Sequence, residues 1–491
     1  MSWMQQLSRV YDNNIDHVGE FEERRNQRIT LLPVSHVMQS AQIELLIDSD
    51  GDFMSAKVIE KENARTVVPA TTGSANRASA SAPHYIHDKL FYVAGDYVPY
   101  TGEKKREKHH QDYLKQMKEW AESPKSSKKV KAIYHYIKKG KVIEDLINEK
   151  VIPTDSNNEI ITKWTSREER PLIYKVVPGD ILSAFVRFDV LHDTADDSVV
   201  WEDKELFDEF IDYLETIEEM ETGYCYVTGK ETLLTTQHGS RIRNAGDMSK
   251  LISANDKSGY TYRGRFAKPT EAVQVGYDVS QKAHHALRWL IQRQGTYVDS
   301  RYFVSFGVEA AEVPAPFEGT ANHLFDFFSA EIDEDAKPQI YTEEIIAEEL
   351  NKALQGKKYE LKEDAMENII ILSVDAATPG RLAIVYYQEL SADLYYKALV
   401  HWHRTCTWRM SFRDGNKWIS YHGAPSTYQI AEAIYGRSGD PRMKKELYTR
   451  ILPSITEKKA IPKDIVRTLF NRVKNPFSFN GLGEWNSVLN M

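Results

Sequence analysis

The sequence predicts a multidomain α+β protein, with a mixed N-terminal α/β region that contains β-hairpins and basic helices, and a C-terminal part that becomes increasingly helical. Length is the first observation, because 491 residues exceed the ~100–200 that one domain usually holds. Composition is the second, because 41% hydrophobic and 27% charged residues give enough apolar content for buried cores. Apolar periodicity, at strand spacing in some stretches and helical spacing in others, is the third. Shifts in composition indicate an N-terminal region at 1–220, a basic, loop-rich middle region at 221–330 and a C-terminal region at 331–491.

The N-terminal region combines a hairpin, a polar loop and charged helices. Residues 41–60 alternate apolar positions around an Asp- and Gly-rich turn, which predicts a β-hairpin. Residues 66–83 are small and polar without a period, which predicts a loop or linker. Residues 107–150 have helical spacing with basic faces, broken near Pro124. The acidic run after Trp201 predicts an amphipathic helix whose charged face is solvated.

The middle and C-terminal regions predict further elements in order. Residues 222–268 have poor apolar periodicity, which favours loops held on short strands. The other predicted elements are a helix at 280–294 opened by Ser280, a strand at 302–306, an acidic helix at 342–355, paired strands at 369–374 and 382–387, and mainly helices after Leu390. The sequence contains no evident internal repeat.

Charge is unevenly distributed along the chain. The totals of 63 Lys+Arg and 72 Asp+Glu give a net charge of −9, which by itself argues against a nucleic-acid-binding protein. However, residues 104–141 hold 13 basic and 4 acidic side chains, and residues 241–268 hold 7 and 2. An acidic stretch at 201–221, with 10 acidic side chains, offsets the first of these basic segments. The sum therefore hides local fields that suit a polyanion.

The cysteine count and the apolar runs predict a cytoplasmic protein. Cys225 and Cys406 are too few for a disulfide framework, which favours a reducing compartment. The N-terminus lacks the basic flank and apolar core of a signal peptide, and no apolar stretch approaches the ~20 residues that span a bilayer. We therefore expect no membrane association.

Candidate catalytic motifs are weak, and we expect neither an enzyme nor a bound cofactor or metal. Gly223 to Lys230 resembles a phosphate loop but has five intervening residues where four are required. His401, His403 and Cys406 could ligate zinc, but packing inside a helix is the favoured interpretation. The same holds for the cluster of His84, His87 and Asp88. A metal-dependent nuclease or hydrolase that uses the 401–406 group with Asp375 stays open as an alternative.

A polar loop and two basic segments suggest contact with nucleic acid. The loop from Thr71 to Ser81 combines hydrogen-bonding side chains, a glycine that permits close approach and one arginine. Its candidate DNA-binding residues are Thr71, Thr72, Gly73, Ser74, Asn76, Arg77 and Ser79. Basic side chains interleaved with aromatic ones suit phosphates and bases. The candidate DNA or RNA backbone contacts are Lys104, Lys105, Arg106, Lys128, Lys129, Arg241, Arg243, Lys250, Lys257, Arg263 and Arg265.

Long sequence blocks resemble one known family. They include ARTVVP at 64–69, HDKL at 87–90, YCYVTGK at 224–230, IRNAGDMSKLISANDKSGYTYRGRF at 242–266, VGYDVSQKAHHALRWLIQRQG at 275–295, DAATPGRLAIVYY at 375–387, HWHRTCTW at 401–408 and IPKDIVRTLFNRVKNP at 461–476. Together they resemble the large subunit of the type I-C CRISPR Cascade complex, a family that recognises the protospacer-adjacent motif (PAM). The resemblance covers almost the whole chain.

The resemblance implies a subunit without a catalytic site of its own. Such a subunit recognises the PAM on double-stranded target DNA, helps to open the duplex, stabilises the R-loop and allows recruitment of a helicase-nuclease. The implied partners are guide CRISPR RNA, target DNA, and the backbone, guide-handle-binding and small Cascade subunits. A purely structural subunit assembled around guide RNA is the second alternative.

The resemblance also carries residues over. It implies that the N-terminal region reads the PAM through the loop from Thr71 to Ser81, with Asn76 and Arg77 as its main readers, although Ala78-Ser79-Ala80 replaces the hydroxyl residues and glycine often found after the arginine. Tyr85 or a nearby aromatic side chain is a candidate wedge at the opened duplex end. Family members usually continue into a helical bundle that resembles the small subunit, and we expect this bundle to be missing here.

Overall fold

The computed structural model of the chain divides into two compact units. The N-terminal unit comprises Ser2–Gly246 and Ile252–Trp289, and the C-terminal unit comprises Asp247–Leu251 and Leu290–Met491. The described residues are 2–77, 81–165, 169–191, 199–217, 220–253, 265–266, 269–309, 313–324, 340–341, 343–360, 368–378, 380–414, 417–479 and 481–489. The three-region division by composition stays a prediction. Both units mix helices with small sheets, which confirms the multidomain α+β class.

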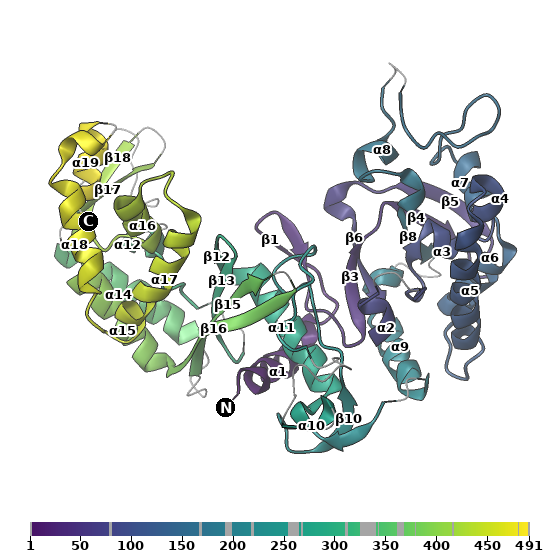
Figure 1. The fold of residues 1–491 in the computed structure, drawn as a ribbon, viewed down its shortest axis with the longest axis horizontal. Helices are drawn as coiled ribbons and strands as arrows, with labels where there is room; N and C mark the ends of the chain where they lie inside the picture. Colours follow the sequence, from purple (N-terminus) through teal and green to yellow (C-terminus); the bar gives the residue numbers. More distant parts are fainter. Residues whose placement is uncertain are drawn as a thin grey trace. The chain divides into compact units, whose positions relative to one another are not determined.

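A four-stranded sheet forms the centre of the N-terminal unit (Figure 1). Its strands β4 (Ile43–Ile47) and β5 (Phe53–Val58) form the predicted antiparallel hairpin. Strand β8 (Phe185–Val190) is parallel to β4, is buried along its whole length, and pairs with β7 (Asp88–Lys89) on its other edge. A strand that is covered on both faces becomes continuously apolar, as most of β8 is.

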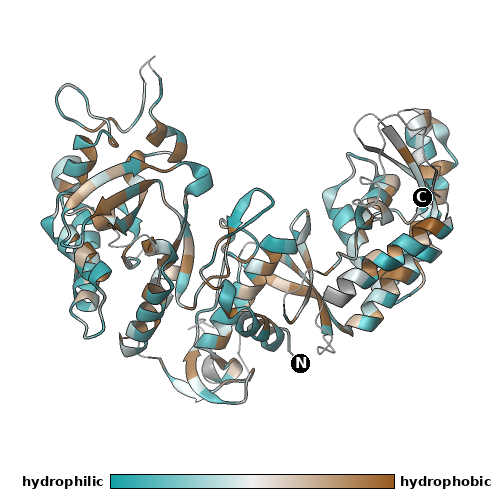
Figure 2. Ribbon diagram, turned by 180° about the vertical axis from the view of Figure 1, so that it is seen from behind, coloured by the Kyte–Doolittle hydropathy of each residue, from teal (hydrophilic) through white to brown (hydrophobic). Residues whose placement is uncertain are grey.

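Helices of the charged segments pack against the sheets of this unit. Helices α5 (Glu107–Ala121), α6 (Lys128–Lys139) and α7 (Val142–Asn148) confirm the predicted basic helices, and α9 (Lys204–Ile217) confirms the acidic one. Each presents apolar residues to the core at helical spacing; for example, Trp120 of α5 is fully buried. Figure 2 shows hydrophobic residues on central strands and hydrophilic residues along the outer helices.

A second antiparallel pair lies beside the polar loop. Strand β3 (His36–Ser40) pairs with β6 (Arg65–Pro69), so the first part of the segment predicted as a loop at 66–83 is a strand. The small and polar residues near this segment favoured a loop. Strand β3, which lies about 30 residues upstream, pairs with the segment and gives it a strand conformation. Helix α11 (Tyr277–Gln294) confirms the predicted helix but begins three residues before Ser280.

Shorter elements complete the N-terminal unit. They are α1 (Trp3–Asn13), β1 (Glu22–Arg24), β2 (Gln27–Ile29), α2 (Thr72–Ala75), α3 (Leu90–Val93), α4 (Tyr97–Thr101), α8 (Leu172–Val176), β9 (Thr222–Tyr224), β10 (Glu231–Thr235), α10 (Pro269–Ala272) and β11 (Val275–Gly276). Strands β9 and β10 agree with the short strands predicted for residues 222–268, and β11 joins them in a three-stranded sheet.

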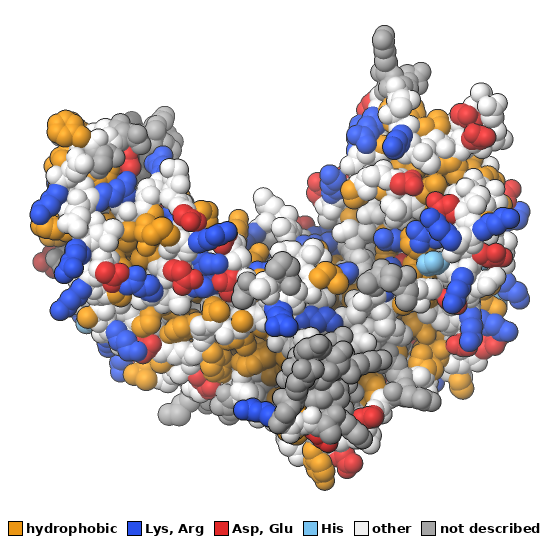
Figure 3. All heavy atoms as spheres, viewed as in Figure 1, with side chains coloured by type: hydrophobic (Ala, Val, Ile, Leu, Met, Phe, Trp, Pro, Cys, Tyr) orange, Lys and Arg blue, Asp and Glu red, His pale blue; other side chains and the backbone are white. Residues whose placement is uncertain are grey.

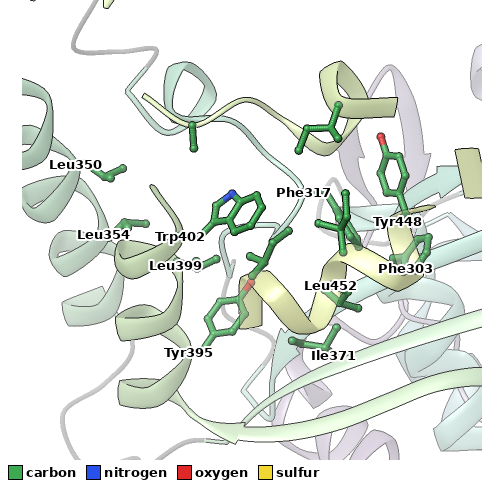
Figure 4. Packing of buried hydrophobic residues seen from close by; sticks show 14 of the residues in the cluster. Phe303, Phe317, Leu350, Leu354, Ile371, Tyr395, Leu399, Trp402, Tyr448 and Leu452 are labelled. Atoms are coloured by element: carbon green, nitrogen blue, oxygen red, sulfur yellow. The ribbon is translucent and has the colours of Figure 1, made fainter. Parts of the chain in front are cut away.

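The C-terminal unit has a second four-stranded sheet. Its order is β12 (Thr296–Val298), β13 (Arg301–Gly307), β15 (Asn368–Thr378) and β16 (Arg381–Ser391). The antiparallel pairing of β15 with β16 confirms the predicted strand pair. A large hydrophobic cluster covers this sheet, and Figure 4 shows Phe303 and Ile371 packed together with aromatic side chains from the helices.

Helices and one further sheet complete this unit. The helices are α12 (Thr320–His323), α14 (Glu343–Glu360), α15 (Ala392–Thr405), α16 (Thr427–Tyr435), α17 (Pro441–Thr456), α18 (Lys463–Val473) and α19 (Leu482–Leu489). Strands β17 (Trp408–Asp414) and β18 (Lys417–Gly423) pair antiparallel, and β14 (Ile340–Tyr341) joins them. The prediction of mainly helices after Leu390 is therefore incomplete, because a hairpin interrupts them. Within the described residues, none of the helices is both long and apolar enough to cross a membrane.

Candidate nucleic-acid interface

Residues 71–77, the described part of the polar loop after β6, form hydrogen bonds of their own. The Thr71 side chain caps helix α2 by accepting from the Ser74 backbone N–H at 3.1 Å. At the other end of α2, the Asn76 amide donates to the Thr72 carbonyl at 3.0 Å. Gly73 is exposed, Ser74 is buried, and Thr72 and Asn76 are half-buried. Ser79 lies outside the described residues.

Arg77 closes the loop through a buried ion pair. Its Nη1 and Nη2 atoms lie 2.6 Å from Oδ2 and Oδ1 of Asp88, which is completely buried. Nη1 also donates to the Ala82 carbonyl at 3.0 Å, and the guanidinium lies 4.8 Å from the Tyr92 ring centroid. Burial raises the pKa of Asp88, and the hydrogen bonds from Arg77 act against that rise. Arg77 therefore fixes the loop from inside, and its predicted contact with bases stays a prediction.

Helix α5 holds the segment that follows the loop. Gln116 donates to the carbonyls of Pro83 at 3.3 Å and His84 at 2.6 Å, and the Tyr113 hydroxyl donates to Ile86. The Tyr85 ring is buried, with its centroid 4.9 Å from that of Phe210. A side chain inside this aromatic cluster cannot insert between base pairs, so the wedge prediction for Tyr85 is wrong.

The histidines beside Asp88 have structural partners. His84 Nδ1 lies 3.1 Å from Ser74 Oγ, and His87 Nδ1 accepts from the Phe188 backbone N–H at 3.1 Å. Burial lowers the pKa of both imidazoles well below the usual range. They are thus neutral groups that tie the loop to the sheet, in agreement with the packing interpretation.

The first basic segment divides into paired and unpaired side chains. Lys104 and Lys105 are exposed, with Lys105 Nζ 3.7 Å from a Glu103 carboxylate oxygen. Arg106 lies over the Phe91 ring at 4.0 Å and 3.5 Å from Glu103. Figure 3 shows Lys and Arg side chains interspersed with Asp and Glu over this unit. The field of this surface is therefore less uniform than the local count of charges suggested.

Two neighbouring lysines of α6 also differ in whether they form an ion pair. Lys128 is exposed and forms no ion pair with a described residue. Lys129 Nζ lies 2.6 Å from Oδ2 of Asp203, whose other oxygen accepts from the N-terminus of α9. Of these two lysines, Lys128 is the one whose charge is not paired with a described carboxylate.

The second basic segment is shared between the two units. Arg241 is half-buried and Arg243 is partly exposed in the N-terminal unit, where Arg265 is exposed. Lys250 belongs to the C-terminal unit, where its backbone N–H donates to the Gly380 carbonyl at 3.2 Å. Burial lowers the pKa of Lys250. The remaining predicted contacts, Lys257 and Arg263, lie outside the described residues.

Sequence reasoning missed Arg288 of α11, a buried residue with 8% of its surface exposed. It lies four residues, about one helical turn, after the buried His284. The signal that could have found it is a charged residue at helical spacing from His284 and Ile291, which are both buried on the same helix.

The residues of the enzyme alternative have other partners. His403 is buried with Nδ1 2.9 Å from Thr320 Oγ1, whereas His401 is exposed. Asp375 binds Arg301, with its Oδ2 3.1 Å from Nε. Burial raises the pKa of the Cys406 thiol. Over the part of the chain that the structure describes, no group of three or more His, Cys, Asp or Glu could hold a metal ion.

Comparison with known proteins defines the class of this chain: a CRISPR-associated protein. The family model described as CRISPR-associated protein (Cas_Csd1) matches residues 8–482. The chain belongs to this family, which confirms the resemblance on which the family prediction rested and supports a place among the subunits of a Cascade complex. No curated protein matches the chain.

Proposed function

We propose that this protein is the large subunit of a type I-C Cascade complex and recognises the PAM on double-stranded target DNA. Family membership supports the CRISPR-associated role. In this proposal the chain works without a catalytic site of its own, in the cytoplasm, alongside guide RNA and the backbone, guide-handle-binding and small subunits. It helps to open the duplex, stabilises the R-loop and allows a helicase-nuclease to be recruited.

The observation that carries the proposal is the way in which residues 71–77, the described part of the polar loop, are held. The Arg77–Asp88 pair and the Thr71 cap fix the conformation of this segment, while Gly73 is exposed at its surface. A polar segment that is held in place before binding loses little conformational entropy when it enters a groove. Asn76 bonds to Thr72 through one amide hydrogen, which leaves its carbonyl oxygen and second hydrogen for a base edge. In this arrangement Arg77 positions the loop and Asn76 reads.

Duplex binding by the assembled complex tests this assignment. A library of target duplexes randomised beside the guide-matched sequence first defines the PAM. We expect Asn76→Ala to reduce the preference for a correct over a scrambled PAM by about tenfold, because one base-edge contact contributes ~1–3 kcal/mol of discrimination. Guide RNA content and subunit composition should not change. The matched control is Asn157→Ala, which alters an exposed asparagine elsewhere in the N-terminal unit.

The outcomes separate the alternatives. Equal PAM preference in Asn76→Ala and wild type would contradict the loop assignment. Equal binding of wild type to correct and scrambled PAM would instead favour the purely structural subunit. DNA cleavage by the purified complex without a helicase-nuclease would favour the enzyme alternative.

A further inference from the structure

Arg288 is a buried cation without a counter-charge in the described part of the chain. Only 8% of its surface is exposed, and its guanidinium forms no ion pair or hydrogen bond with a described residue. Burial and the like charges of Arg65 and Arg241 lower the pKa of Arg288 to about 10. An isolated charge is strongly disfavoured in a protein interior unless a partner compensates it. The arrangement therefore calls for an anion from outside the described chain.

The loop that carries Arg241 packs against the face of α11 that carries Ser280 and His284. His238 Nδ1 lies 2.9 Å from Ser280 Oγ, and a Cβ on Gly239 would come within 3.0 Å of His284 Cβ. Arg241 follows Gly239 by two residues. On α11, Ser280, His284 and Arg288 are spaced by four residues, so their side chains share one face of the helix. Close packing of the backbone at 238–239 thus brings a loop arginine beside a helix arginine.

The conformation of Arg241 is itself unusual. Its φ of 59° is a left-handed value that residues with side chains rarely adopt. Its Nε atom is buried and makes no hydrogen bond with a described residue. Burial, followed by the charge of Arg77, lowers the pKa of Arg241. A strained backbone under an uncompensated, half-buried guanidinium is typical of a ligand-binding site rather than of packing.

Arg65 is the third arginine of a cluster formed with Arg241 and Arg288. The cluster lies near Arg77. Arg65 Nη2 donates to Gln27 Oε1 at 3.1 Å, a neutral partner that leaves its charge uncompensated. Burial, followed by the charges of Arg77 and Arg241, lowers the pKa of His84, and His84 Nδ1 lies 3.1 Å from Ser74 Oγ of the polar loop, so Arg241 lies near that loop. Since Arg77 is satisfied by Asp88, the uncompensated charge belongs to Arg65, Arg241 and Arg288.

We propose that Arg241 and Arg288, supported by Arg65, bind one phosphodiester group of a nucleic-acid strand next to residues 71–77 of the polar loop. Guanidinium groups form paired, charge-assisted hydrogen bonds with phosphate oxygens, and a desolvated site strengthens them. This inference rests on the proposed function for the nucleic acid that supplies the phosphate. The target duplex and the guide RNA offer the same group, so the test has an arm for each.

The experiment combines salt titrations with thermal unfolding. The assembled complex binds target duplex over a range of salt concentrations, and the purified chain binds guide RNA over the same range. Arg288→Met and Arg241→Gln should weaken one of these by about tenfold or more and lower its salt slope by about one, as expected for one lost phosphate contact. The matched control is Arg170→Gln, an exposed arginine of the N-terminal unit.

Each outcome has one meaning. A lower slope with duplex assigns the phosphate to DNA, and a lower slope with guide RNA assigns it to RNA. Unchanged slopes in both arms overturn the proposal. Arg288→Met should also leave the melting temperature of the free protein unchanged or higher, because it removes an uncompensated buried charge. A clear fall in melting temperature would indicate a structural role and overturn the proposal as well.

Failure of this inference and failure of the proposed function can be told apart. Normal slopes in Arg288→Met, together with a strong PAM preference in wild type, would leave PAM recognition standing and remove only the phosphate site. A lowered slope in the variant, together with no PAM preference in wild type, would do the reverse.

Discussion

One buried arginine from each unit, Arg301 and Arg288, has surroundings opposite to those of the other. Arg301 in β13 of the C-terminal unit is 6% exposed, and Arg288 in α11 of the N-terminal unit is 8% exposed. Arg301 Nη2 lies 3.0 Å from Asp375 and 2.8 Å from Glu446, whereas Arg288 has no carboxylate partner in the described chain. Equal burial therefore hides a difference in charge compensation. A compensated arginine fits a structural role, and an uncompensated one fits a binding role.

The Asp375 centre shows what complete compensation involves. Ser300 donates to Asp375 Oδ1 at 2.6 Å, Lys445 Nζ lies 3.2 Å from Oδ2, and the Thr449 hydroxyl lies 2.6 Å from Arg301 Nη1. Burial would raise the pKa of Asp375, but these hydrogen bonds and charges lower it overall. The carboxylate that looked like a possible metal ligand in the sequence is thus part of a structural network.

Removing Arg301 should have the largest effect on stability. We expect Arg301→Met to reduce the free energy of unfolding of the C-terminal unit by about 3 kcal/mol or more, because it leaves Asp375 with too little compensating charge. Hydrogen exchange in denaturant, resolved to peptides of each unit, measures the loss separately in the two units. The matched control is Arg404→Met, which alters an exposed arginine of the same unit.

A similar loss of stability in Arg301→Met and Arg288→Met would contradict the difference in charge compensation. Equal destabilisation by Arg301→Met and Arg288→Met would show that Arg288 is compensated in solution. A nearly neutral Arg301→Met would show that the Asp375 network adds little to the stability of this unit.

Much of the fold could be predicted because local patterns and tertiary contacts agree. The hairpin at 41–60 has alternating apolar positions and a turn sequence, and the helices of 107–150 have helical spacing. The strand β6 (Arg65–Pro69) and the hairpin of β17 with β18 were missed, since their partners rather than their own residues decide them.

The candidate site could be predicted only by residue type and not by partner. The sequence showed Arg77 in a polar loop, but the pairing with Asp88 depends on how the chain turns between them. The choice of Tyr85 failed because an aromatic side chain beside a loop can be buried as easily as exposed. Arg288 was hidden inside a regular helix. Whether a charge is compensated is a property of three-dimensional packing that spacing along a chain does not contain.

A change of pH should give an effect of intermediate size that tests the charge environment of Arg288. His285 is half-buried and lies three residues before Arg288 on α11, and its Nδ1 lies 3.0 Å from the Leu32 carbonyl. Burial, followed by the charge of Arg288, lowers the pKa of His285 to about 3. A histidine that is neutral in the folded state and protonated in the unfolded state stabilises the protein above its unfolded pKa of about 6.5, and this stability is lost as the pH falls toward the folded pKa.

We therefore expect His285 to account for a loss of about 2 kcal/mol in the free energy of unfolding between about pH 7 and about pH 5. Chemical denaturation at both pH values should show a smaller loss in His285→Asn, which retains a donor near the Leu32 carbonyl but does not titrate. The exposed His135 provides the control His135→Asn. The same pH dependence in His285→Asn and wild type would contradict the burial of a neutral imidazole beside Arg288.

The smallest effects are expected at two adjacent surface lysines, one with and one without a carboxylate partner among the described residues. Lys128 forms no ion pair with a described residue, whereas Lys129 is bound to Asp203 at 2.6 Å. We expect Lys128→Gln to lower the salt slope of duplex binding by about one and to change stability by less than about 0.5 kcal/mol. Lys129→Gln should leave the slope nearly unchanged and reduce stability by about 1 kcal/mol, because Asp203 loses its partner at the start of α9. Equal slope changes in the two variants would show that an ion pair of this kind opens readily to a phosphate, and that compensation within the chain does not decide which cations bind nucleic acid.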